Sequence, residues 1–138
     1  MSLFERDLLR RLIRQLGEIA ARIAGLSTQR KFDEAEALLR QIEGELLGPL
    51  TATLDQVDIR TVLLLLGSDD KIGACAVLWS ERAKLLSARG EPQSARVLAT
   101  RSLELLDALE ARAGLTSELL LNARSAMREL VTPEPRTG

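Results

Sequence analysis

The chain of 138 residues is 46% hydrophobic but only 2% aromatic, and it carries one cysteine and no histidine. Nineteen basic and twenty acidic residues leave a formal charge of −1, which excludes a general attraction for nucleic acid or for an anionic membrane. A single cysteine excludes an intramolecular disulfide, and the lack of histidine removes the commonest general base and metal ligand.

The N-terminal part of the sequence predicts a helical hairpin. Apolar residues spaced alternately by three and four indicate a first helix from Ser2, as its N-cap, to about Leu26. That seam by itself is compatible with a coiled coil, but further apolar residues beside it favour packing inside a bundle. A second helix is expected from Lys31 to Leu47, where the following Gly-Pro pair ends it. The short turn between the two helices makes them antiparallel.

Residues 48–70 are the least regular part of the chain. Either Asp55 or Asp58 can cap a short helix over Ile59–Leu66. Consecutive apolar residues leave this helix without a polar face, so we expect it to be buried on all sides or covered by another chain. The residues proposed for such an interface are Val62, Leu63, Leu65 and Leu66.

A second hairpin is predicted next. Its first helix covers residues 70–88, and Gly90 turns the chain. Its second helix has Pro92 in the first turn, where proline is tolerated, and runs to about Arg112.

A last helix is capped by Thr116 or Ser117 and ends near Val131. We therefore expect a single helical domain over residues 1–131, followed by a disordered polar tail. Its parts are a first hairpin, an insertion with the short apolar helix, a second hairpin, a capping helix and the tail, over residues 1–47, 48–70, 71–114, 115–131 and 132–138.

The N-terminal residues do not resemble a signal peptide, because charged side chains interrupt every apolar run there. The longest uninterrupted apolar stretch, Val62 to Leu66, is too short to span a bilayer. The sequence therefore predicts a cytoplasmic protein with no membrane span.

Two hairpin segments match weakly when the sequence is shifted by about sixty positions. The second copy has a large residue in its first helix, a small residue one turn later, a glycine in the turn and an alanine in its second helix. These residues are Trp79, Ala83, Gly90 and Ala95. The pattern resembles a tetratricopeptide repeat (TPR), and an earlier unit around Ala35 is similar in outline. The chain is also similar to small bacterial helical proteins.

This resemblance implies an all-α fold, in which antiparallel helix hairpins stack as a short right-handed array or bundle of about six helices. A plain helical bundle is the alternative, because Leu-rich amphipathic hairpins align readily with one another. In the TPR family the first helix of each unit lines a concave, peptide-binding surface. The matching positions here are Gly17, Ala20, Ala24 and Ser27, and Val77, Ser80, Lys84 and Ser87. Lys84 would pair with a peptide carboxylate there, or else the small residues only let the helices pack closely.

Other candidate sites are better explained without catalysis. Cys75 lies on an apolar helix face, which is typical of a packed hydrophobic residue. Residues 67–73 contain glycines and a lysine near a helix start, but they lack the Gly-Lys-Ser/Thr core of a phosphate loop and the alternating ligands of a calcium loop. We therefore predict no enzymatic activity, no cofactor and no bound metal.

A basic strip, formed by Arg6, Arg10 and Arg14, follows one face of the first helix. It is either a docking surface for an acidic partner or an ordinary solvated helix face, since acidic residues lie close by.

Taken together, these patterns predict a non-catalytic adaptor or scaffold that binds a peptide or helix of another protein. The alternative is a structural homo-oligomer, such as a homodimer, that assembles through the first helix and the apolar helix over Val62–Leu66.

Overall fold

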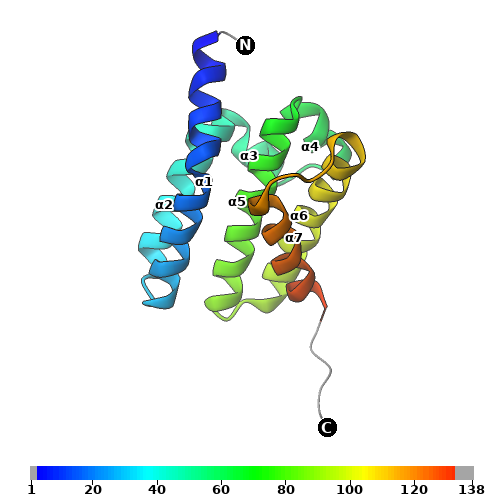
Figure 1. Ribbon diagram of the computed structural model, residues 1–138. Coiled ribbons are helices and arrows are strands. Elements are labelled where there is room, and N and C mark those ends of the chain that lie inside the picture. Colours follow the sequence, from blue (N-terminus) through cyan, green and yellow to red (C-terminus); the bar gives the residue numbers. More distant parts are fainter. Residues whose placement is uncertain (1–2, 133–138) are drawn as a thin grey trace.

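The computed structural model describes residues 3–132, and within this range every side chain except those of residues 3–6, 8, 9 and 12. The described residues form six α-helices of eight or more residues, one single-turn helix and one 3-10 turn, with no strand among them (Figure 1). The predicted all-α fold of about six helices is therefore confirmed. The elements are α1 (Leu3–Thr28), α2 (Phe32–Leu47), η1 (Gly48–Leu50), α3 (Thr51–Leu54), α4 (Ile59–Leu66), α5 (Asp69–Ala88), α6 (Pro92–Ala113) and α7 (Glu118–Val131).

Local side-chain chemistry fixes several helix starts. Asp58 caps α4, because its carboxylate accepts a hydrogen bond from the Thr61 amide at 2.9 Å. Ser117 caps α7 by accepting from the amide two residues further on at 3.1 Å. Of the alternatives that the sequence left open, the structure therefore selects Asp58 over Asp55 and Ser117 over Thr116.

Glycines with a positive φ follow four of the helices, α2, α4, α5 and α6, and two of these glycines bear on the predicted helix ends. Gly67 follows α4 with φ of +79°, and Gly90 lies between α5 and α6 with φ of +85°. Gly90 lies at the predicted turn, and Gly67 directly follows the last residue of the predicted short helix over Ile59–Leu66. The expected N-cap at Ser2 and the tail over residues 133–138 lie outside the described residues.

Helix α5 lies at the centre of the fold. It packs against α1 and α2 on one side and against α6 and α7 on the other (Figure 1). Every residue from Ile72 to Glu81 is buried. The neighbouring helices can approach closely because the first turns of α5 carry small residues. A Cβ added at Gly73, for example, would lie 3.5 Å from both Leu109 of α6 and Leu120 of α7.

The short apolar helix α4 is only partly covered. Val62 and Leu66, one turn apart, are buried in the core, and Leu63 is half-buried. In contrast, Leu64 is 77% exposed and Leu65 is 39% exposed. The expectation that this helix is buried on all sides by its own chain is wrong, because a helix at the surface presents one face to the core whatever its composition. Among the described residues, no helix combines the length and apolarity needed to cross a membrane.

Arg101 of α6 fastens the irregular segment before α4 to the rest of the fold. Its guanidinium donates hydrogen bonds to the carbonyl oxygens of Leu54 at 2.8 Å and of Val57 at 2.9 Å. The same group lies 4.9 Å from the centre of the Trp79 ring, a cation–π contact with α5. One arginine thus joins three parts of the chain, a role that sequence spacing did not indicate.

Candidate interaction cleft

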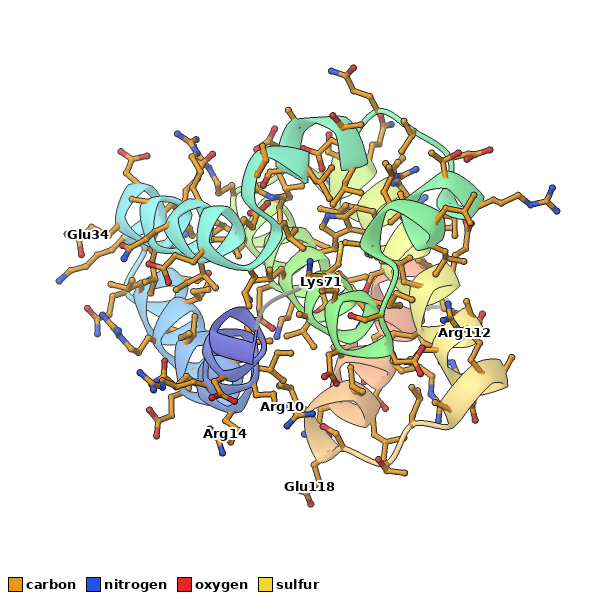
Figure 2. All side chains as sticks on the ribbon, turned by 90° about the horizontal axis from the view of Figure 1, so that it is seen from above. Arg10, Arg14, Glu34, Lys71, Arg112 and Glu118 are labelled. Atoms are coloured by element: carbon orange, nitrogen blue, oxygen red, sulfur yellow. The ribbon has the colours of Figure 1, made fainter. Side chains whose placement is uncertain are left out.

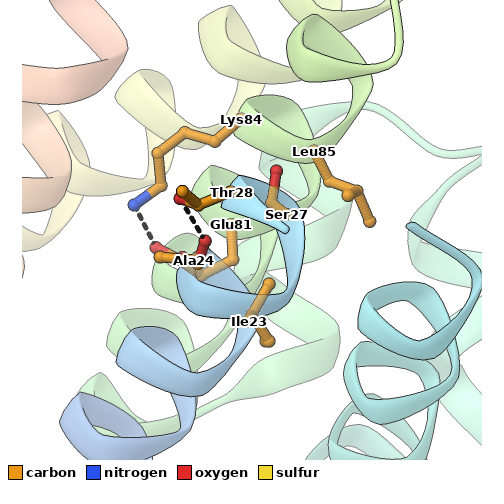
Figure 3. Close-up of a pocket in the computed structure, with 7 residues that line it drawn as sticks. All are labelled: Ile23, Ala24, Ser27, Thr28, Glu81, Lys84 and Leu85. Carbon is orange, nitrogen blue, oxygen red and sulfur yellow. Dashed lines mark hydrogen bonds and ion pairs between the residues drawn. The ribbon is translucent and has the colours of Figure 1, made fainter. Parts of the chain in front are cut away.

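Helices α1 and α5 pack against each other and enclose a cleft of about 200 Å³, which we call the α1–α5 cleft (Figure 3). Three of the residues predicted for a concave surface meet there, namely Ala24 and Ser27 of α1 and Lys84 of α5. The other residues that line it are Ile23, Thr28, Glu81 and Leu85. The structure therefore brings together one end of the surface that the sequence suggested.

The remaining residues predicted for this surface do not line the cleft. Ser80 is fully buried, and its hydroxyl donates a hydrogen bond to the Val77 carbonyl oxygen at 2.7 Å. A partner cannot reach it without opening the core. Ala20 and Ser87 are half-buried beside the cleft residues in sequence, without lining the cavity.

A buried carboxylate in the cleft was missed by the sequence reasoning. The Glu81 side chain is only 6% exposed, and its Oε2 lies 2.5 Å from Nζ of Lys84. Burial raises the pKa of Glu81, and the attraction of Lys84 offsets this only in part. The available signal was that Glu81 is the single acidic residue between Asp70 and Glu91, in the middle of a helix that is otherwise suited to a core.

The predicted basic strip borders a second cleft, of about 400 Å³, near the N-terminal half of α1. Arg10, Ile13 and Arg14 line it together with Asp70, which lies at the start of α5. Both arginines are exposed, and they leave α1 on the same side when the molecule is seen from above (Figure 2). The side chain of Arg6, the third residue of the strip, lies outside the described residues.

The residues predicted for an apolar interface on α4 are divided between core and surface. Val62 and Leu66 belong to the protein's own core, whereas Leu65 is exposed and Leu63 is half-buried. The most exposed apolar side chain of the helix, Leu64, lies within the predicted segment Val62–Leu66 but was not one of the four residues singled out. The surface available on α4 therefore centres on Leu64 and Leu65.

A third cleft, of about 350 Å³, lies between α5, α6 and the segment after α3. It is lined by Asp55, Arg82, Ser94, Val97, Leu98 and Arg101. Its arginines are already engaged, because Arg82 forms an ion pair with the buried Glu43 and Arg101 donates to backbone carbonyl groups. Burial raises the pKa of Glu43, and Arg82 counteracts that shift in part.

Of the residues considered for catalysis or metal binding, one is buried in the core and another is engaged in an ion pair. Cys75 is fully buried, and burial raises the pKa of its thiol far above neutrality, so the reactive thiolate is disfavoured. Asp69 forms an ion pair with Arg112 at 3.2 Å. Within the part of the chain that the structure describes, no group of three or more His, Cys, Asp or Glu side chains is placed to hold a metal ion.

The α1–α5 cleft combines a buried carboxylate (Glu81) with its partly exposed partner Lys84, two hydroxyl groups, and apolar walls formed by the buried residues Ile23 and Leu85. Such a combination suits recognition of a polar side chain that has an apolar stem. No protein-family model, no curated protein and no solved structure matches this chain.

Proposed function

We propose that the chain is a cytoplasmic interaction module that binds a segment of another protein in the α1–α5 cleft. The observation that carries this proposal is the meeting of Ala24, Ser27 and Lys84 around one cavity. These residues come from the first helices of the two hairpins, which the TPR resemblance assigns to a ligand-binding surface. Small side chains on α1 leave space there, and the charged pair on α5 supplies specificity.

The order of packing supports a TPR-like arrangement. The first helix of the second hairpin, α5, packs against both helices of the first hairpin, and α7 packs in turn against α5 and α6. The alanines of the TPR-like pattern, Ala35, Ala83 and Ala95, are all at most 1% exposed. Small residues at these positions allow the helices to approach closely, which is the role that the resemblance assigns to them.

Filling the cleft tests the proposal. Ala24 is exposed and lines the cavity, so Ala24→Trp should occupy the space of the ligand without disturbing the core. Proteins captured from cells of the source organism should be lost with this variant. Ala37→Trp is the matched control, because Ala37 is an exposed alanine of α2 that does not line the cleft.

A second candidate function is a structural homo-oligomer, and the exposure of Leu64 and Leu65 favours it. Adjacent exposed leucines on a surface helix are typical of protein interfaces. This candidate needs no ligand in the α1–α5 cleft, so the oligomeric state of the pure protein separates it from the first.

A further inference from the structure

One charged group of the α1–α5 cleft, the Glu81 carboxylate, is buried and can only accept hydrogen bonds when it is ionised. The Glu81 carboxylate is held at its base by α5 and is nearly excluded from water. A carboxylate in such a place attracts a positive group more strongly than one in solvent does, because the local dielectric constant is lower.

The end of α1 adds to this negative potential. The cleft is lined by the last two turns of α1, and the last turn of that helix contains no basic residue. Arg30 and Lys31 follow the helix, and their amides donate to the carbonyl oxygens of Ser27 and Leu26. The carboxyl end of a helix carries partial negative charge and favours cations. Thr28 already uses its hydroxyl proton, since its Oγ1 donates to the Ala24 carbonyl oxygen at 2.9 Å, and this leaves its oxygen to accept (Figure 3).

Lys84 occupies the cation position in the free protein. Of the described residues that line the cleft, it alone is basic, and its amine reaches down to Glu81 (Figure 3). Its side chain is 43% exposed, so the ammonium group can return to water at small cost. The Glu81 side chain, in contrast, is only 6% exposed and stays within the packed interior.

Resting on the proposed function, we propose that the cleft receives a cationic side chain, arginine or lysine, of the bound protein, which replaces Lys84 beside Glu81. Ile23 and Leu85 supply apolar walls for the methylene stem of that side chain. A cavity of about 200 Å³ holds one long side chain, not a helix. Lys84 therefore acts as an internal competitor of the ligand.

This assignment reverses the role that the sequence suggested for Lys84. If Lys84 bound a carboxylate of the partner, its removal would weaken binding. If Lys84 competes with a cation of the partner, its removal strengthens binding, because Glu81 loses its internal counter-ion. The sign of the effect therefore distinguishes the two roles.

The test uses the full chain, labelled with ¹⁵N, and three small probes that share one backbone: N-acetyl-N′-methylamides of arginine, lysine and glutamate. The arginine and lysine probes should shift the amide signals of residues 23–28 and 81–85, and the glutamate probe should not. Lys84→Met should tighten binding of both cationic probes several-fold. Glu81→Gln should weaken it by about tenfold or more, as expected when one member of a buried charge pair is removed.

Two controls accompany these variants. Lys71→Met removes the same charge from a lysine in the first turn of α5 that does not line the cleft, and it should leave binding of the probes unchanged. The amide spectrum of Glu81→Gln shows whether that variant keeps the fold. If it does not, Lys84→Met still decides, because Lys84 is exposed.

Any of three results would overturn the inference: weaker cation binding by Lys84→Met, binding of the glutamate probe in the cleft, or no shift with either cationic probe in the parent and in Lys84→Met. If Ala24→Trp abolishes protein capture but neither the parent chain nor Lys84→Met binds a cationic probe, the proposed function stands and this inference is wrong. If the parent chain binds the cationic probes but Ala24→Trp still captures every protein, the proposed function is wrong.

Discussion

Two buried glutamates dominate the electrostatics of the core at the scale of single residues. Glu43 of α2 and Glu81 of α5 are both nearly inaccessible, and each has one basic partner, Arg82 or Lys84. In both cases burial raises the pKa more strongly than the partner lowers it. The ionised forms of both carboxyl groups therefore cost stability.

Stability should consequently fall as the pH rises from 4.5, the ordinary glutamate value, through the raised pKa of Glu81 in the folded protein. Within that window the folded state binds more protons than the unfolded state, so raising the pH favours unfolding. Glu43 contributes a slope of the same sign, so Glu81→Gln should make this part of the curve shallower without abolishing the slope, as measured by denaturant unfolding at a series of pH values. Glu34→Gln, at an exposed position, is the control. If stability depends on pH as steeply in Glu81→Gln as in the parent chain, the assignment of this slope to Glu81 is wrong.

Glu36 should act in the opposite direction. Hydrogen bonds from Arg89 and Arg40 lower its pKa, so its contribution is present above pH 4.5 and is lost as the pH falls through its lowered pKa. The stability slope caused by Glu36 lies below pH 4.5 and has the opposite sign to the slope caused by Glu81 above pH 4.5. The loss of stability caused by Glu81 can therefore be distinguished from acid unfolding.

At the scale of elements, α5 shows what periodicity can and cannot predict. Its ends were predictable, because Ser68 and Gly90 carry local capping and turn chemistry. The burial of every residue from Ile72 to Glu81 was not predictable, since the pattern indicated a single apolar face. Small residues such as Gly73 are compatible with either a solvent-facing or an enclosed surface, and tertiary packing decides between them.

Enlarging Gly73 tests that enclosure. Gly73→Leu would place a side chain against Leu109 and Leu120, and overpacking of this kind costs about 1–3 kcal/mol. Gly25→Leu on α1 is the matched control, because no atom lies within 4 Å of a Cβ at that position. Denaturant unfolding should show Gly73→Leu to be the less stable of the two, and equal stabilities would exclude tight packing around α5.

Helix α4 illustrates the same limit. Its start, its end and its apolar composition were all readable from the sequence. Which of its leucines face the core depends on how the helix lies on α5 and α6, so the exposure of Leu64 and the burial of Val62 could be seen only in the structure. The same limit applies to the α1–α5 cleft. Ala24 and Lys84 were predicted as binding residues, but Glu81, which lines the same cleft, was not.

At the scale of the whole molecule, two surfaces compete for the role of principal interface. The α1–α5 cleft is a recessed polar site, whereas Leu64 and Leu65 form an exposed apolar site on a different helix. Because these surfaces do not share residues, one can be altered without the other.

The homo-oligomer requires Leu64 and Leu65 to be covered. If it forms, light scattering after size-exclusion chromatography should give the mass of a dimer, and Leu64→Glu should return the protein to a monomer by burying a charge at the interface. Val97→Glu is the control, because Val97 is 64% exposed on α6. A monomer of the parent chain across micromolar concentrations would exclude this candidate.

Binding of another protein in the α1–α5 cleft is tested most directly by protein capture. The captured proteins are quantified in parallel for the parent chain, Ala24→Trp and Ala37→Trp. We expect at least one protein that the parent and Ala37→Trp retain equally and that Ala24→Trp loses. Identical sets of captured proteins for all three chains would contradict this expectation.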